Sequence, residues 1–160
     1  MLAWLESSAL SIWMRDSLMA YPIMLTIHAI GMALLVGTLT VIALRVLGVG
    51  RYSLVPLQEF FLVVRVGFIV SLLSGSILFL TAPSAFAGAT YFFFSPTFRI
   101  KILMIVLGIV TALLLKGRLT RDGIDRLDGD VPPGVKALAG LSLVLWFGAI
   151  MVGRLTAYLP

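Results

Sequence analysis

Cysteine is absent from this 160-residue sequence, histidine occurs once, at His28, and charged residues make up only 12% of the chain. The lack of cysteine excludes disulfide bonds and thiolate-ligated metal sites. The low charge excludes an ordinary soluble domain, in which about 25% of residues are charged. Because 61% of the residues are hydrophobic, most of the molecular surface must face lipid, and the first expected partner is a lipid bilayer.

Other kinds of functional motif are also missing. No glycine-rich phosphate loop precedes a helix, and no pair of carboxylates lies within a hydrophobic segment. The four aspartates between residues 122 and 130 have the wrong spacing for a calcium loop, and no glutamate closes it. The net charge of +5 does not indicate nucleic-acid binding, because basic residues gather on the cytoplasmic loops of membrane proteins.

Four long hydrophobic segments dominate what is present, at about residues 22–47, 57–81, 98–119 and 134–158. Each is long enough to cross a hydrocarbon core of about 30 Å, which takes roughly 20 helical residues. Prolines and glycines mark their ends, and no internal repeat or second domain is evident. The sequence therefore predicts an all-α integral membrane four-helix bundle, with residues 1–160 forming a single membrane domain.

The segment before the first span, at about residues 2–17, has a different pattern. Apolar residues recur at helical spacing on one side, and polar residues occupy the other. This predicts an amphipathic helix that lies on the membrane surface, with a helix packed on a partner subunit as the alternative. The segment is not typical of a signal peptide, because it lacks a basic start and Glu6 interrupts the apolar run.

The loops predict the orientation. Basic residues occur in the first and third loops, whereas the second loop, residues 83–95, carries no charge. The positive-inside rule therefore places the first and third loops in the cytoplasm and both termini outside. We expect a multi-pass protein with this orientation.

His28 is the strongest candidate for function, because ionisable residues inside a span usually face the bundle interior and mark a site. It lies six residues after Pro22, so about 9 Å into the membrane at 1.5 Å per residue. Three basic residues are expected at the same face, and a glycine follows the histidine by one turn. The candidate set is His28, Gly31, Arg99, Lys101 and Arg154.

This arrangement suits a heme. Imidazole is a common axial ligand of heme iron, and Arg or Lys can bind propionates by charge-assisted hydrogen bonds. His28 would ligate the metal, the basic residues would bind the propionates, and Gly31 would leave room for a flat macrocycle. The second span has a strip of small residues that could host the ring or let helices approach closely, formed by Ser71, Ser74, Gly75 and Ser76. The heme would be b-type and non-covalent, since there is no cysteine to attach it.

Two other interpretations remain open. A lone histidine in a span can simply form a hydrogen bond to a neighbouring helix. Alternatively, Met24, His28 and Met32 lie on one stripe, and thioether and imidazole groups suit Cu(I). Copper is less favoured, because the two methionines are about 12 Å apart along the helix axis and methionine often fills apolar gaps.

Two stretches, His28-Ala-Ile-Gly-Met-Ala-Leu-Leu-Val-Gly37 and Arg99-Ile-Lys101-Ile-Leu-Met-Ile-Val-Leu, resemble a superfamily of small bacterial membrane proteins. It includes the heme-binding membrane protoporphyrinogen oxidase and the copper-resistance D-type domain. The Trp-Leu-Glu-Ser run at Trp4 is also similar to the opening of an uncharacterised four-helix bacterial membrane domain. The resemblance implies His28 as axial ligand, Lys101 as its polar partner and a location in the bacterial cytoplasmic membrane. The oxidase has further histidines that this chain lacks.

The sequence thus leads to two functional hypotheses. The first is a membrane-embedded protein that binds one b-type heme near its outer face, for electron transfer or redox chemistry, as a homodimer or as a small subunit of a larger complex. The second is a cofactor-free accessory subunit that packs against a membrane complex through its small-residue faces. Whether the protein is an enzyme does not follow from the residues.

Overall fold

The computed structural model describes residues 8–49, 57–81, 95–121 and 131–155, which form five helices and no strand. The helices are α2 (Ala9–Asp16), α3 (Ala20–Leu47), α4 (Leu57–Leu80), α6 (Pro96–Arg121) and α7 (Pro133–Leu155). The four longer helices are apolar and long enough to cross a membrane. The prediction of an all-α membrane four-helix bundle is confirmed.

Local chemistry accounts for where several helices begin and end. The Ser8 side chain caps α2 by accepting a hydrogen bond from the backbone N–H of Ser11. Helix α3 ends at Gly48, whose φ of 109° is left-handed and whose N–H bonds back to the carbonyl of Arg45. Pro96 and Pro133 each occupy a first helical position, where the missing N–H has no helical partner to lose. Residues 2–7 of the expected surface helix and residues 156–158 of the expected fourth span lie outside the described part of the chain.

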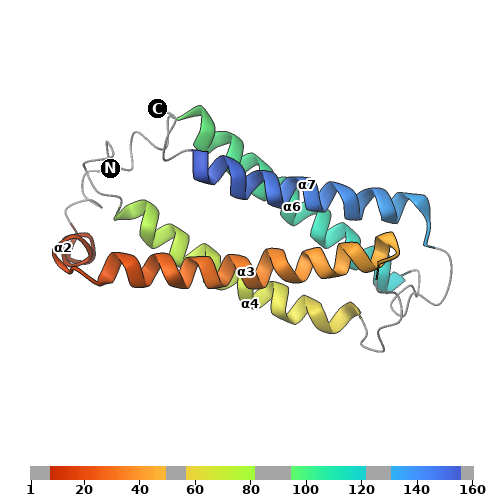
Figure 1. Ribbon diagram of the computed structural model, residues 1–160, viewed down its shortest axis with the longest axis horizontal. Helices are drawn as coiled ribbons and strands as arrows, with labels where there is room; N and C mark the ends of the chain where they lie inside the picture. Colours follow the sequence, from red (N-terminus) through yellow and green to blue (C-terminus); the bar gives the residue numbers. More distant parts are fainter. Residues whose placement is uncertain (1–7, 50–56, 82–94, 122–130, 156–160) are drawn as a thin grey trace.

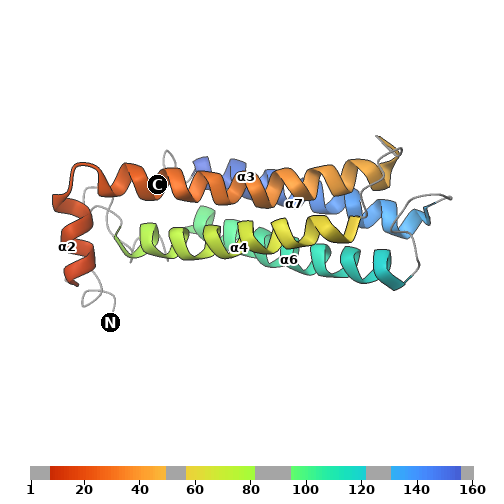
Figure 2. The same cartoon turned by 90° about the horizontal axis from the view of Figure 1, so that it is seen from below.

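Helix α2 lies across one end of the bundle, transverse to the four long helices (Figures 1 and 2). Ser11 and Met14 are buried, whereas Ile12 and Trp13 are exposed. The hydroxyl of Ser17 accepts a hydrogen bond from the N–H of Ala20 and joins α2 to the start of α3. A short helix with this placement is suited to lie in the plane of the membrane surface.

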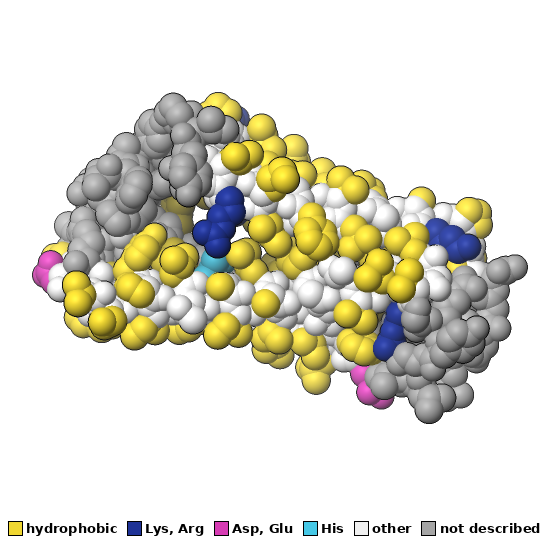
Figure 3. Space-filling view, viewed as in Figure 1, with side chains coloured by type: hydrophobic (Ala, Val, Ile, Leu, Met, Phe, Trp, Pro, Cys, Tyr) yellow, Lys and Arg dark blue, Asp and Glu magenta, His cyan; other side chains and the backbone are white. Residues whose placement is uncertain are grey.

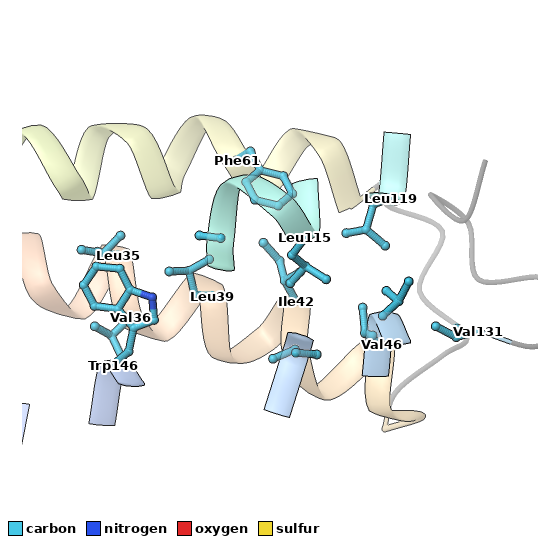
Figure 4. Close-up of a cluster of buried hydrophobic side chains, with 14 residues drawn as sticks. Leu35, Val36, Leu39, Ile42, Val46, Phe61, Leu115, Leu119, Val131 and Trp146 are labelled. Carbon is cyan, nitrogen blue, oxygen red and sulfur yellow. The ribbon is translucent and has the colours of Figure 1, made fainter. Parts of the chain in front are cut away.

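The long helices form two antiparallel pairs, α3 with α4 and α6 with α7 (Figure 1). Helix α3 also packs on α7 and joins the pairs, while α4 and α6 meet only sparsely. One cluster of buried side chains fills the part of the bundle beyond Leu35, away from α2 (Figure 4). On α3 this cluster runs from Leu35 to Val46, and Leu115, Leu119 and Trp146 contribute from the other pair.

The outward faces are suited to lipid. Large hydrophobic side chains are exposed along all four long helices. Hydroxyl groups on these helices bond to carbonyls one turn earlier in the same helix, as Thr26 does to Pro22 and Ser76 to Leu72. These two hydroxyls are thereby satisfied without water, as a hydrocarbon environment requires. Among the described residues, the buried Ser71 Oγ, Ser142 Oγ and Trp146 Nε1 have no hydrogen-bond partner. The chain is a multi-pass membrane protein.

Candidate functional site

Two glycines bring α3 and α4 into close backbone contact next to His28. A Cβ atom added to Gly67 would lie 2.6 Å from the backbone N of Leu35 and 2.9 Å from the carbonyl O of Gly31. A Cβ added to Gly31 would lie 2.8 Å from the backbone N of Ser71. Such close approach of helix backbones is typical of small residues in membrane bundles. Because α4 is so near, the imidazole of His28, one turn before Gly31 on α3, reaches α4 about one turn beyond Ser71.

The His28 ring lies against Ser74 and Gly75 of α4. Its Nδ1 is 3.0 Å from the Ser74 Oγ. A Cβ added to Gly75 would lie 2.9 Å from the His28 Cε1, so the ring occupies the space that a side chain at position 75 would need. The predicted small-residue strip of the second span therefore has a defined role, in which Ser74 and Gly75 form a notch for the imidazole.

The hydrogen bonds of Ser74 define which nitrogen of His28 carries the proton. A hydroxyl has one hydrogen to donate, and the Ser74 Oγ donates it to the carbonyl O of Val70 at 2.5 Å. With its hydrogen directed to a backbone carbonyl, the same Oγ accepts from His28, and this network assigns the ring proton to Nδ1. In the neutral ring the other nitrogen, Nε2, is left with a lone pair. The Ser71 backbone also lies within hydrogen-bonding reach of the ring.

Lys101 of α6 is a cation that interacts with the His28 ring. Its side chain passes over α7 at Gly153, where an added Cβ would lie 3.2 Å from the Lys101 Cε. The ammonium lies close enough to His28 to interact with it electrostatically. Figure 3 shows the single histidine, in cyan, on the visible face next to a basic side chain. Within the described ranges no carboxylate forms an ion pair with Lys101.

An aromatic stack lies next to the site, where α4 ends and α6 begins. The rings of Phe79 on α4 and Phe98 on α6 are stacked with centroids 5.1 Å apart. Phe79 lies one turn beyond Gly75, and Phe98 lies one turn before Lys101. The stack joins α4 to α6 at the end of the bundle that holds His28 and Lys101.

The remaining predicted site residues are placed differently. Arg99 and Arg154 lie at the same end of the bundle and are exposed, without a described contact to His28 or Lys101. Gly31 faces α4, and its missing side chain makes room for Ser71 rather than for a macrocycle. The structure thus brings together His28 and Lys101. It adds Ser74 and Gly75, which the sequence marked only as small residues, and Gly153, which the sequence did not single out.

The predicted copper ligands all lie on α3. Met24 and Met32 are partly buried on α3, but no described contact joins either sulfur to His28. The described residues also contain no group of three or more His, Cys, Asp or Glu side chains that could hold a metal ion.

Comparisons of the chain with protein-family models, with curated proteins and with solved structures found no match. The functional assignment therefore depends on the geometry of the site.

Proposed function

We propose that the chain is a membrane-embedded b-type heme protein for electron transfer or redox chemistry. We further propose that it lies in the bacterial cytoplasmic membrane, with both termini outside. The observation that carries the proposal is the hydrogen bond between His28 Nδ1 and Ser74, because it leaves Nε2 as the lone-pair nitrogen. Histidines that bind metals generally have the other ring nitrogen held in this way by a hydrogen-bond acceptor.

The available donor groups fit a heme. His28 offers one neutral imidazole nitrogen, and Lys101 offers an ammonium that no described carboxylate neutralises. Arg99 and Arg154 are exposed at the same end and are free to turn toward a carboxylate there. When bound, a heme supplies one-electron redox chemistry, while the protein sets its potential through the ligand, hydrogen bonds and burial.

Each residue of the site has a physical task in this proposal. Ser74 fixes the rotation and the tautomer of His28, and Gly75 leaves space for the ring. Lys101 provides a charge-assisted hydrogen bond to a propionate. Since the chain has one histidine, ligation by two imidazoles requires a homodimer with the heme at its interface. Otherwise the sixth position is filled by another residue or stays open.

The experiment is an absorption spectrum of the protein purified in mild detergent from heme-replete cells. We expect a Soret band and a reduced-minus-oxidised α band typical of b-type heme. His28→Ala should abolish both bands while the protein stays in the membrane, since alanine is well tolerated in helices. Thr26→Ala is the matched control, because Thr26 is exposed and bonds only to Pro22 of its own helix.

Equal spectra for wild type and His28→Ala would contradict the proposal. A colourless wild type, expressed together with its operon partners, would favour the cofactor-free accessory subunit. His28 would then have only the interhelical hydrogen bond to Ser74 as its role.

A second pair of variants tests the cation. Lys101→Met should weaken heme retention by roughly tenfold or more, because a hydrogen bond to a charged group contributes about 1.5–3 kcal/mol. Lys136→Met removes the same charge at the opposite end of the bundle and should leave heme content and midpoint potential unchanged. If the two variants behave alike, Lys101 only extends its charge toward the membrane surface.

A further inference from the structure

Two shallow grooves meet at Arg118, at the end of the bundle opposite His28. The larger, of about 420 Å³, is lined by Leu113, Leu114, Gly117, Arg118 and Arg121. The smaller, of about 190 Å³, is lined by Arg118, Pro132, Gly134, Val135 and Leu138. Both are open to the surroundings of the helices, and neither belongs to the site at His28.

The larger groove has a clear polarity along α6. Its lining residues lie on one outward face of the helix, opposite the buried Leu115 and Leu119. The leucines lie toward the middle of the span, and Arg118 and Arg121 lie in its last turns. From Leu113 to Arg121 the face extends about 12 Å at 1.5 Å per residue. A membrane lipid has the same order, with an acyl chain toward the bilayer centre and a charged headgroup at the surface.

The groove is open because glycine forms part of its wall. A Cβ added to Gly117 would meet no atom within 4 Å. The guanidinium groups of Arg118 and Arg121 are exposed, and no carboxylate in the described part of the chain forms an ion pair with either. Figure 3 shows basic side chains at this end, beyond a band of hydrophobic ones. The groove therefore combines an apolar wall with two cations that have no described counter-ion.

We propose that this groove binds an anionic glycerophospholipid, with its phosphate on Arg118 and Arg121 and an acyl chain along Gly117, Leu114 and Leu113. A guanidinium group can donate two parallel hydrogen bonds to a phosphate. Basic residues next to a span attract anionic lipids. The second groove continues this site around Arg118 toward α7. The proposal is independent of whether His28 binds heme.

The test is native mass spectrometry of the full-length protein in detergent, with added phosphatidylglycerol or phosphatidylcholine of identical acyl chains. We expect the wild type to retain phosphatidylglycerol in preference to phosphatidylcholine. The double variant Arg118→Gln with Arg121→Gln should lower retention of phosphatidylglycerol roughly 100-fold, at about tenfold for each charge-assisted hydrogen bond that is lost. Lys136→Gln removes a charge at the same end but outside both grooves, so it removes no hydrogen bond to the phosphate and retention should stay close to that of wild type.

Gly117→Leu distinguishes lipid binding in the groove from non-specific attraction of the lipid to the two arginines. It keeps both arginines and fills open space, so it should lower lipid retention severalfold while helix content and thermal stability stay unchanged. Unchanged retention in Gly117→Leu would overturn the proposal. So would an equal loss in Lys136→Gln, which indicates attraction without a site, or full displacement of the lipid by inorganic phosphate, which indicates that the acyl chain contributes nothing.

Discussion

Among single residues, Ser74 has the largest influence on His28. The direction of its one hydroxyl hydrogen determines which nitrogen of His28 is left to bind a metal. The hydrogen goes to the Val70 carbonyl, so the Ser74 oxygen accepts the proton-bearing Nδ1 of His28. The imidazole is consequently held in one tautomer and one orientation before any ligand binds. A side chain held in this way loses less conformational entropy when it ligates a metal.

Ser74→Ala should therefore lower heme affinity about 10- to 100-fold, the usual effect of losing the partner of a metal-ligating histidine. Ser76→Ala is the matched control, because Ser76 is exposed and bonds only to Leu72 of its own helix. The measurement is heme titration of apoprotein followed at the Soret band. Equal affinities in the two variants would show that Ser74 does not position a ligand.

The sequence identified some of these residues and not others. His28 and Lys101 could be selected because ionisable side chains inside spans are rare and usually functional. Ser74 and Gly75 were recognised only as small residues, since their role depends on which face of α4 meets α3 and in which register. The grouping of Arg99 and Arg154 around His28 remains a prediction.

At the scale of secondary-structure elements, the approach of α3 to α4 fixes the position of His28. Gly67 and Gly31 remove side chains at the point of closest approach, and the Leu35 backbone occupies the space beside Gly67. Backbone atoms cannot rotate away as the end of a side chain can. The packing of this pair is therefore sensitive to a single added methyl group.

Gly67→Ala should destabilise the protein by about 1–3 kcal/mol, the usual cost of overpacking. Gly37→Ala should instead stabilise the protein by about 0.5–1 kcal/mol, because alanine is more stable than glycine inside a helix. A Cβ at position 37 meets nothing within 4 Å. Thermal unfolding in detergent measures both. A neutral Gly67→Ala would contradict the close packing of α3 on α4.

Hydropathy and proline positions predicted the existence of the helices and most of their ends. They could not predict which helices pair. Helices α3 and α4 are apolar nearly all round, so no hydrophobic periodicity distinguishes a face toward protein from a face toward lipid. In lipid, small residues and hydrogen bonds decide the pairing instead, and the glycine contacts of this pair become visible only in three dimensions.

At the scale of the whole molecule, the bundle has two chemically different ends. One end holds His28 and Lys101 beside α2, and the other holds the apolar cluster and the arginines of α6. The positive-inside rule predicts that the arginine end faces the cytoplasm. The proposed heme would then lie near the outer face and the proposed lipid in the inner leaflet.

Single cysteines test this orientation without interference, because the chain has no native cysteine. In intact cells, Ser84→Cys should react with an impermeant thiol reagent. Ser53→Cys and Gly129→Cys should react only after the membrane is permeabilised. The reverse labelling pattern would place the His28 site on the cytoplasmic side.

His28 is the only histidine in the chain, so its ligation of the heme iron can be measured without interference from other imidazoles. Labelling the protein with [¹⁵N]histidine marks this one side chain, and pulsed electron paramagnetic resonance of the oxidised heme protein then reports whether it ligates the iron. We expect a directly coordinated ¹⁵N coupling, assigned to Nε2, that disappears in unlabelled protein. A heme signal with pyrrole ¹⁴N couplings and no ¹⁵N coupling, or a protein that takes up no heme, would contradict it.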